Sequence, residues 1–411
     1  MKILMVSFIL AISVLTPPCY AEQLLKKVHP VELVNDDFSD LAIFGDALGD
    51  KRIVFLDELS HGEKEVFQLK NRLVQYLHQE KGFEVLLLEG SIYDVHRIWQ
   101  NAKSTINEQA PGNIFYMYAN SQGFQALFNY IDKKRHASFP LALSGFDGRL
   151  SGQYASKEVA DYIKKSTKYF LKDAIADFDW SSYLIQIKKN LAYSQQLPNK
   201  EMQNKFVQQS YYLYDRLLAH QSNKSGFDSP QYLALLVKGL LFSAEERWGT
   251  RRHDENDIPM AENMAWLLDT VYPNKKVIVL GHYIHLNANG AEINRYANIG
   301  TELAKSHGDD IYTVHIAGAK GHYREFRDLS VQAIEPLSEH SIEQDLLAYF
   351  PKNASKKKES LFIDEHNLNA ELIRNKHFFG HEYKHYIRGN DWQNHWDGMF
   401  LINQVSASQS P

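Results

Sequence analysis

The chain has 411 residues, of which 44% are hydrophobic and 23% are charged, a composition typical of a globular protein with a large core. Its formal net charge is −5 and its main basic run is residues 356–358, so the composition gives no support to nucleic-acid binding. Cys19 is the single cysteine. A mature chain that lacks it has no disulfide, no thiolate nucleophile and no cysteine-bound metal.

The first 21 residues have the pattern of a secretory signal peptide. Lys2 supplies the positive end, residues 3–15 form a short apolar stretch, and residues 19–21 provide a cleavage site. The apolar stretch is shorter than the roughly 20 residues of a membrane-spanning helix, and two prolines end it. We therefore expect a secreted product, periplasmic in a Gram-negative source, with no membrane attachment after cleavage. An uncleaved membrane anchor is the alternative.

Residues 52–90 predict a strand, an amphipathic helix and a second strand. Short apolar runs at 53–56 and 85–88 are typical of buried parallel strands. Apolar residues recur between them at helical spacing: Val66, Leu69, Leu73 and Leu77. Such a βαβ unit brings Glu58, His61 and Glu89 to the carboxyl-end edge of the sheet, where open α/β sheets bind ligands.

Three further strands are expected at 140–145, 276–280 and 311–316. The first ends near Asp147, which is either a fourth site residue or an ordinary turn aspartate. The second ends in His282 and His285. The whole pattern predicts an α/β fold with a mostly parallel central sheet flanked by helices.

Residues 155–248 are helical in pattern and poor in strands. We expect them to form an inserted helical subdomain that covers the carboxyl-end edge and shapes a substrate pocket, within a core made of 22–154 and 249–405. The simpler alternative is that these helices only pack on a face of the sheet. The tail after Ser406 is expected to be disordered.

Five side chains at three predicted strand ends carry acid, base or ligand chemistry: Glu58, His61, Glu89, His282 and His285. In one interpretation, a histidine oriented by a glutamate takes a proton from water, which then attacks an electrophile. In the other, Glu58, His61, Glu89 and His282 bind a divalent metal that activates the water. Each residue alone could also be an ordinary turn residue, and these alternatives stay open at this point.

Two further features have competing interpretations. Lys70 lies in the apolar stripe of the helix expected at 63–79, where it either reaches the surface or places a cation near the glutamates. Residues 381–385 fit the zinc-protease pattern H-E-x-x-H, which requires a stable helix and a third ligand downstream. Gly380 and Gly389 flank the motif and predict at most a short helix, which disfavours a zinc protease.

The order and spacing of these residues resemble the erythromycin esterase family over residues 35–402. The segments that carry the resemblance are LDELSHG at 56–62, Glu89, GFD at 145–147, NDIPMAEN at 256–263, GHYIH at 281–285 and WDGMF at 396–400. The resemblance implies a hydrolase without metal or cofactor that opens macrolide lactone rings. It implies that His61 activates water, that Glu58 orients it, and that Glu89, His282 and His285 complete the pocket and stabilise an oxyanion.

Three positions depart from the family pattern. Asp57 replaces a glycine and adds a charge next to Glu58, Asn256 stands where arginine is usual, and Lys70 stands where an active-site arginine is frequent. Neither lysine nor asparagine can form the paired hydrogen bonds of an arginine guanidinium, so these replacements are not conservative. We therefore expect hydrolysis of a small-molecule ester or lactone rather than of macrolides specifically, with Lys70, Asp147 and Asn256 in supporting roles. A metal-dependent hydrolase and a catalytically inactive periplasmic binding protein are the alternatives.

Overall fold

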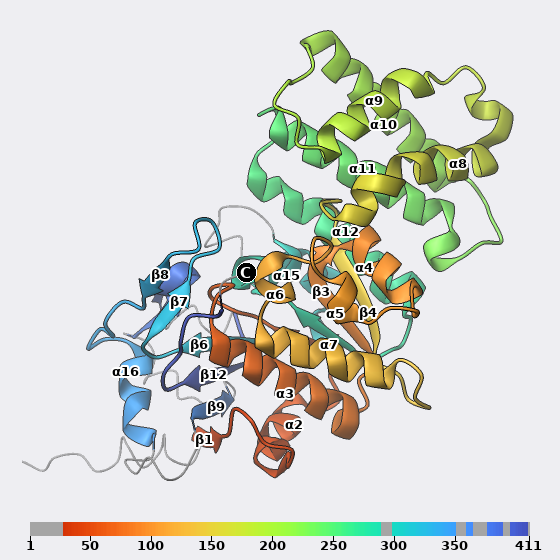
Figure 1. Cartoon of the computed structure of the whole chain (residues 1–411). Coiled ribbons are helices and arrows are strands. Elements are labelled where there is room, and N and C mark those ends of the chain that lie inside the picture. The colour runs from red at the N-terminus through yellow and green to blue at the C-terminus, as the bar shows by residue number, and fades with distance from the viewer. Residues whose placement is uncertain (1–27, 289–297, 351–358, 365–375, 389–394, 410–411) are drawn as a thin grey trace, which may run out of the picture.

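A computed structural model describes residues 28–288, 298–350, 359–364, 376–388 and 395–409 (Figure 1). The expected signal segment, 1–21, lies outside the described residues, and its cleavage stays a prediction. No helix among the described residues combines the length and apolar character that a membrane span requires.

The core of the fold is an eight-stranded sheet with the order β1-β9-β12-β6-β2-β5-β3-β4. Neighbouring strands from β12 to β4 pair in parallel, while β9 pairs antiparallel with both β12 and β1. This arrangement confirms the predicted α/β fold with a mostly parallel sheet. The strands, in sheet order, are β1 (Val28–Val31), β9 (Ser360–Asp364), β12 (Gly398–Ile402), β6 (Ile311–Gly318), β2 (Ile53–Leu56), β5 (Val277–Leu280), β3 (Val85–Ser91) and β4 (Ala142–Asp147).

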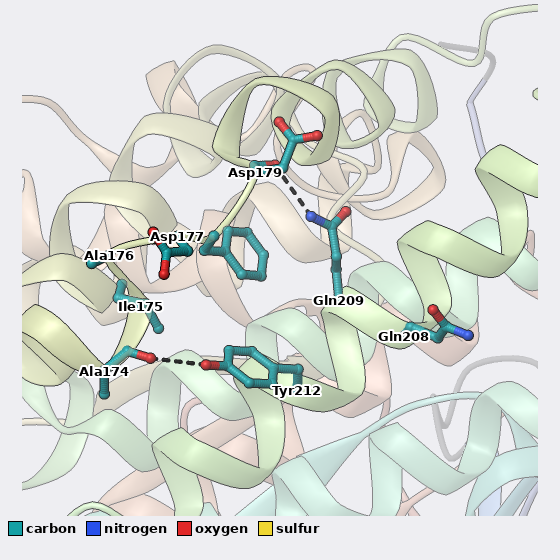
Figure 2. Close-up of a pocket in the computed structure, with 9 residues that line it drawn as sticks. Ala174, Ile175, Ala176, Asp177, Asp179, Gln208, Gln209 and Tyr212 are labelled. Atoms are coloured by element: carbon teal, nitrogen blue, oxygen red, sulfur yellow. Dashed lines mark hydrogen bonds between the residues drawn. The ribbon is translucent and has the colours of Figure 1, made fainter.

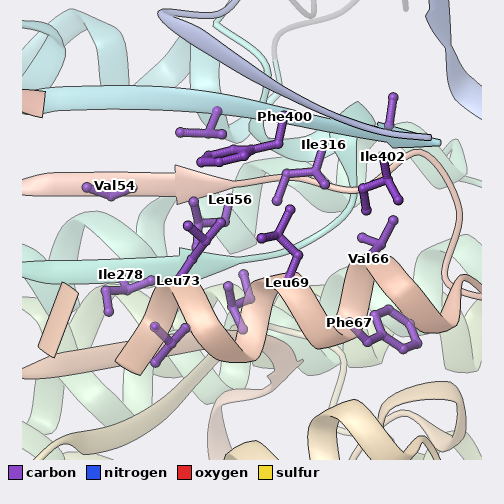
Figure 3. Close-up of a cluster of buried hydrophobic side chains, with 14 of the residues drawn as sticks. Val54, Leu56, Val66, Phe67, Leu69, Leu73, Ile278, Ile316, Phe400 and Ile402 are labelled. Carbon is purple, nitrogen blue, oxygen red and sulfur yellow. The ribbon is translucent and has the colours of Figure 1, made fainter. Parts of the chain in front are cut away.

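Helix α3 (Lys64–Lys81) is the crossover between β2 and β3, as the apolar spacing predicts. It ends at Gly82, whose φ of 75° is the left-handed conformation that favours glycine at a helix end. Its stripe faces the sheet, where Val66, Leu69 and Leu73 pack beneath strand residues (Figure 3). The labelled strand residues above the helix are Val54, Leu56, Ile278, Ile316, Phe400 and Ile402. This packing fixes the end of β2, and with it the first residues of the candidate site.

The chain between β3 and β4 is helical, and α7 lies beside α3 on one face of the sheet (Figure 1). These helices are α4 (Ile92–Gln100), α5 (Ile106–Gln109), α6 (Tyr116–Ala119) and α7 (Gln122–Lys134). The remaining helices near the sheet are α2 (Ala42–Leu48), α13 (Tyr283–Leu286), α15 (Ile299–His307) and α16 (Ile342–Leu346).

A second helical group separates β4 from β5 and stands beyond one end of the sheet (Figure 1). It consists of α8 (Ala160–Leu171), α9 (Trp180–Leu191), α10 (Lys200–Ala219) and α11 (Pro230–Arg247), and α12 (Asp257–Trp266) follows it. Its apolar side chains belong to the same buried cluster as Ile53, Phe55 and Val279 of the sheet. The helices are therefore packed continuously with the sheet, and the boundaries 155 and 248 of a separate subdomain stay a prediction.

Two hairpins lie outside the main sheet: β7 (His322–Arg324) with β8 (Val331–Ala333), and β10 (His377–Gly380) with β11 (Lys384–Arg388). The H-E-x-x-H segment is a short 3-10 turn, His381–Tyr383, followed by β11. Glu382 has a φ of 54°, which is not helical. Because the two histidines do not share an α-helix, the segment lacks the scaffold of a zinc-protease site.

The expectation of a disordered tail after Ser406 is wrong for its first residues. Ser406 accepts a hydrogen bond from the Lys64 amide at 2.9 Å, and Ser408 donates one to the Gly62 carbonyl at 2.7 Å. The segment 406–408 therefore runs antiparallel to the loop that follows His61, with its bridge between Glu63 and Ala407. The expectation rested on the general disorder of terminal residues, whereas backbone pairing with a distant loop holds this segment in place.

Candidate active site

The loop between β2 and α3 carries Glu58 and His61 to the carboxyl end of the sheet. Gly62 follows, and a Cβ atom at this position would come within 2.0 Å of the Arg324 carbonyl oxygen. The Arg324 amide in turn donates to the Gly62 carbonyl at 3.1 Å. Glycine thus lets another backbone segment lie directly against the loop, which sets the position of the neighbouring His61.

Three donors converge on the buried carboxylate of Glu58. Oε1 accepts hydrogen bonds from His61 Nδ1 at 2.7 Å and from the Tyr118 hydroxyl at 2.6 Å, and Oε2 accepts one from Lys70 Nζ at 2.5 Å. Burial raises the pKa of Glu58, but the charge of Lys70 and the hydrogen bond from His61 outweigh burial and hold that pKa below its ordinary value. Glu58 is therefore an anion at neutral pH, and Lys70 is its buried counter-ion rather than a surface lysine.

The protonation of His61 follows from this anion. A carboxylate can only accept, so we assign the proton of the neutral imidazole to Nδ1, which leaves a lone pair on Nε2. Nε2 has no hydrogen-bond partner among the described residues. The rings of Phe115, Phe326 and His282 surround His61, with centroids 5.0, 5.5 and 4.7 Å away. The imidazole is thus bound through Nδ1 and has Nε2 left without a bond in the described structure, the arrangement that general-base chemistry needs.

His282 lies against His61 but uses both of its ring nitrogens for structure. Nδ1 accepts from the Ile284 amide at 3.3 Å, which caps α13, and Nε2 lies 3.1 Å from the Leu59 carbonyl. Its backbone amide donates to Glu89 Oε2 at 2.7 Å. His282 therefore ties the ends of β2, β3 and β5 together, and neither nitrogen is free to act as a base.

His285 lies between two carboxylates. Its Nδ1 is 2.7 Å from Asp257 Oδ1, and its Nε2 is 3.6 Å from Glu89 Oε1, beyond hydrogen-bond distance. Burial lowers the pKa of His285, but the charges of Asp257 and Glu89 outweigh it and raise the pKa to about 9. The ring is therefore an imidazolium at neutral pH, with Nε2–H directed toward Glu89 but too far away to bond to it.

The two other residues expected in support lie in separate networks. Asp147 binds Arg149, with Nη2 at 2.7 Å from Oδ2 and Nε at 2.9 Å. Asn256 donates to Glu246 Oε2 at 2.7 Å and to the His253 carbonyl at 2.9 Å. Within the described part of the chain, no hydrogen bond or ion pair joins Asp147 or Asn256 to His61 or Glu58. The structure thus does not bring these two into the network around His61.

Asp57 lies beside Glu58 in sequence, but its side chain points elsewhere. Its carboxylate accepts from His315 Nδ1 at 3.0 Å, from the Ile316 amide at 3.0 Å and from Trp396 Nε1 at 3.0 Å. Successive residues of an extended segment face opposite sides, so the added charge is bound behind β2 instead of in the site. The charge that Asp57 adds next to Glu58 in the sequence is therefore separate from the network around the Glu58 carboxylate.

Sequence reasoning missed three residues that the structure places in these networks: Tyr118, Arg149 and Asp257. Asp257 lies within the segment that carries the family resemblance, next to Asn256, so its acidic side chain was a usable signal. Arg149 follows Asp147 by two residues and could have been considered as its partner. Tyr118 belongs to the four-residue helix α6, and no periodic pattern marks so short an element.

The donor set does not fit the metal alternative. Both oxygens of Glu58 are engaged by the ammonium, hydroxyl and imidazole donors, and both ring nitrogens of His282 are engaged by the backbone. Over the described ranges, no group of three or more His, Cys, Asp or Glu side chains is placed to hold a metal ion. We therefore derive no catalytic step through a metal.

A pocket of about 430 Å³ opens in the helical group, away from the residues above (Figure 2). It is lined by residues 174–179 and by Gln208, Gln209 and Tyr212. Tyr212 donates to the Ala174 carbonyl at 2.8 Å and Gln209 to the Asp179 carbonyl at 3.2 Å, so these two side chains bind the local backbone (Figure 2). None of the predicted site residues lines this pocket.

Fold and site together define an α/β protein in which the carboxyl-end edge of a parallel sheet and the start of α12 bring together two carboxylate–histidine pairs, a type of site suited to hydrolysis. The chain belongs to the erythromycin esterase family, because the model of that family matches residues 78–405. This confirms the resemblance drawn from the sequence motifs. The match includes Glu89, His282 and His285 but begins after Glu58 and His61.

Individual relatives are distant in sequence and similar in fold. YbfO of Bacillus subtilis (strain 168), a provisionally named hydrolase, is 25% identical over 320 residues, which are 72% of this chain and 71% of YbfO. A Bacillus cereus protein of solved structure has a TM-score of 0.70 at 18% identity, covering 95% of this chain and 98% of its own. A variant of the erythromycin esterase EreC in its open conformation has a TM-score of 0.67 at 15% identity, covering 92% and 98%.

Proposed function

We propose that this member of the erythromycin esterase family hydrolyses a small-molecule ester or lactone by attack of water that His61 activates. The observation that carries the proposal is the buried Glu58–His61 pair, in which Nδ1 is bound at 2.7 Å and Nε2 has no partner within the described structure. A carboxylate that holds one ring nitrogen fixes the tautomer and makes the other nitrogen a general base.

The proposed reaction has two steps. His61 Nε2 takes a proton from water as the water oxygen bonds to the carbonyl carbon, which produces a tetrahedral oxyanion. The oxyanion then collapses, the bond to the leaving oxygen breaks, and the imidazolium of His61 returns its proton to that oxygen. The products are a carboxylic acid and an alcohol, or one hydroxy acid where the substrate is a lactone.

His285 and its two carboxylates provide a proton donor, whereas the Glu58–His61 pair provides a proton acceptor. His285 is held protonated by Asp257 and Glu89, and its Nε2–H lies beyond hydrogen-bond distance of Glu89. A charged donor of this kind can stabilise a developing oxyanion. In the proposal the two histidines divide the work, His61 acting as the base and the protonated His285 as the donor to the oxyanion. Lys70 acts in the proposal as the counter-ion of Glu58.

The first test compares wild type with His61→Ala on an ester panel that includes a macrolide lactone. Wild type should turn over at least one ester, detected for lactones as the mass gain of one water. His61→Ala should lower kcat about 10²- to 10⁴-fold, the usual contribution of general-base catalysis. Chelator treatment should leave the wild-type rate unchanged. Equal turnover by both proteins would contradict the assignment of His61.

Substrate range and export complete the proposal. Asn256 binds Glu246, and the cation nearest Glu58 is the ammonium of Lys70 rather than a guanidinium. These features favour general ester or lactone hydrolysis over macrolide specificity. The side chain of Asp57 points away from the site, so its replacement of the family glycine does not favour an inactive binding protein. We further propose export to the periplasm, which a mature amino terminus at residue 22 in that fraction would support.

A further inference from the structure

Tyr118 contacts both members of the Glu58–His61 pair, although it lies 57 residues beyond His61 in the chain. Its hydroxyl is 2.6 Å from Glu58 Oε1 and 3.2 Å from His61 Nδ1. Because an ionised carboxylate has no proton to give, the tyrosine hydroxyl is the donor in the shorter contact. Tyr118 and His61 therefore share one oxygen of Glu58.

The hydroxyl of Tyr118 is held in place by the packing of its ring. The ring stacks on Phe124 with centroids 4.3 Å apart, and meets Phe67 and Phe115 edge-on at 5.8 and 5.4 Å. These neighbours come from α7, from α3 and from the residue before α6. Tyr118 is fully buried, so the direction of its O–H bond is set by the fold rather than by solvent.

The hydroxyl keeps its proton throughout the pH range in which enzymes work. Burial and the charges of Glu58 and Glu89 raise the pKa of Tyr118 well above its ordinary value of 10. Tyr118 therefore donates to Glu58 throughout the reaction. His61, in contrast, gains a proton at Nε2 and returns it in the proposed mechanism.

We propose that Tyr118 is a positioning residue that moderates how strongly Glu58 holds a proton on His61. The Tyr118 hydroxyl donates to Oε1, the same oxygen that accepts from His61 Nδ1–H. This second hydrogen bond weakens the attraction between the Glu58 carboxylate and the imidazolium form of His61. As a result, the neutral form of His61, with a lone pair on Nε2, persists to a lower pH than it would if Glu58 were bound by His61 without Tyr118. The kinetic consequence of this assignment rests on the proposed function.

The decisive variant is Tyr118→Phe, with Tyr130→Phe as its matched control. Tyr130 also places a hydroxyl on a histidine, at 2.6 Å from His78 Nδ1, but outside the site. Without the Tyr118 hydroxyl, Glu58 stabilises the imidazolium of His61 more strongly, so the acidic limb of the pH–rate profile should move upward by about 0.5 to 1 unit. We expect kcat on the acidic side of the profile to fall about 3- to 10-fold, the factor that corresponds to this shift, with KM within twofold, and Tyr130→Phe to change neither.

A double-mutant cycle distinguishes a positioning role from a structural one. If Tyr118 acts through Glu58, Tyr118→Phe should change kcat less than twofold when Glu58→Gln is already present. A purely structural defect would lower kcat by the same factor in both backgrounds, and that result would overturn the proposal. An equal loss in Tyr130→Phe would overturn it as well.

A measurement without substrate separates this proposal from the proposed function. Diethyl pyrocarbonate modifies unprotonated imidazole, so peptide mass mapping of His61 modification against pH gives a midpoint for the ring. That midpoint should rise in Tyr118→Phe. A shifted midpoint in a protein that hydrolyses no ester would refute the hydrolase and retain the role of Tyr118. Hydrolysis with an unshifted midpoint would refute the role of Tyr118. If the phenylalanine variant does not fold, Tyr118→3-fluorotyrosine, a stronger donor, should lower the midpoint, and an unchanged or raised value would refute the proposal.

Discussion

At the scale of the residue, the notable feature is a fully buried ion pair at the centre of the site. Lys70 and Glu58 are 2.5 Å apart, and both side chains are essentially inaccessible to solvent. Removing one partner of such a pair leaves the other charged and unpaired in a medium of low dielectric constant, which is far costlier than losing an exposed pair.

Lys70→Met should therefore destabilise the protein by about 3 to 5 kcal/mol, measured as the free energy of unfolding in urea at pH 7. The pKa of Glu58 should rise at the same time, because its nearest positive charge is gone. The matched control is Lys205→Met, which breaks the exposed pair of Lys205 with Asp179 and should cost far less. Similar losses in the two variants would contradict a special role for the buried pair.

His285 should also make the free energy of unfolding depend on pH. Its pKa is raised to about 9 in the folded protein, so the pairing contributes stability that is fully present below about pH 6.5. That contribution, on the order of 3 kcal/mol, is lost as the pH rises through about 9. Asp257→Asn removes its hydrogen-bonded counter-ion and should flatten this part of the profile.

The measurement compares urea unfolding of wild type and Asp257→Asn at pH 6, 7.5 and 9.5. The difference in stability between them should be largest at pH 6 and should shrink toward pH 9.5. Asp310→Asn, which removes the exposed partner of Arg52 and involves no histidine, should instead give a profile parallel to that of wild type. Parallel profiles for Asp257→Asn would show that His285 is not held protonated.

At the scale of the element, the site depends on the close approach of two backbone segments at Gly62. Gly62→Ala would drive a Cβ atom to within 2.0 Å of the Arg324 carbonyl, so one of the two segments must move. We expect a loss of about 1 to 3 kcal/mol in stability and a larger loss in kcat, because His61 is the adjacent residue. Gly308→Ala, with only a contact of 4.0 Å to Ala304, should leave both quantities within error of wild type.

Helices and strands that have a regular spacing of apolar residues were predictable from the sequence. Strands that depend on pairing with a segment far away in the chain were not. Residues 53–56, α3 and residues 85–88 form a local unit whose apolar spacing reads directly as strand, helix and strand. By contrast, β1 is a four-residue edge strand that contains Pro30, and β9 pairs antiparallel with β12, which lies far along the chain. Nothing local in the sequence specifies such partners.

At the scale of the whole molecule, the sheet explains which site residues could be foreseen. Glu58, His61, His282 and His285 follow strand ends, and Glu89 lies near the end of β3, so a parallel topology alone brings them to one edge. The orientation of each side chain needed the structure: Asp57 turns to His315 and Trp396, and His282 turns to the backbone. Lys70 had two possible directions from its helix, and only the packed core shows that it points to Glu58.

The segment 406–408 has a practical consequence for anyone who handles this protein. Its backbone forms the wall behind the loop of His61, bonded to Lys64, to Gly62 and to the guanidinium of Arg324 at 2.8 Å. A variant that lacks residues 406–408 therefore loses part of the backbone that holds the loop of His61 in place. Loss of turnover in such a variant would report on this support and not on the chemistry.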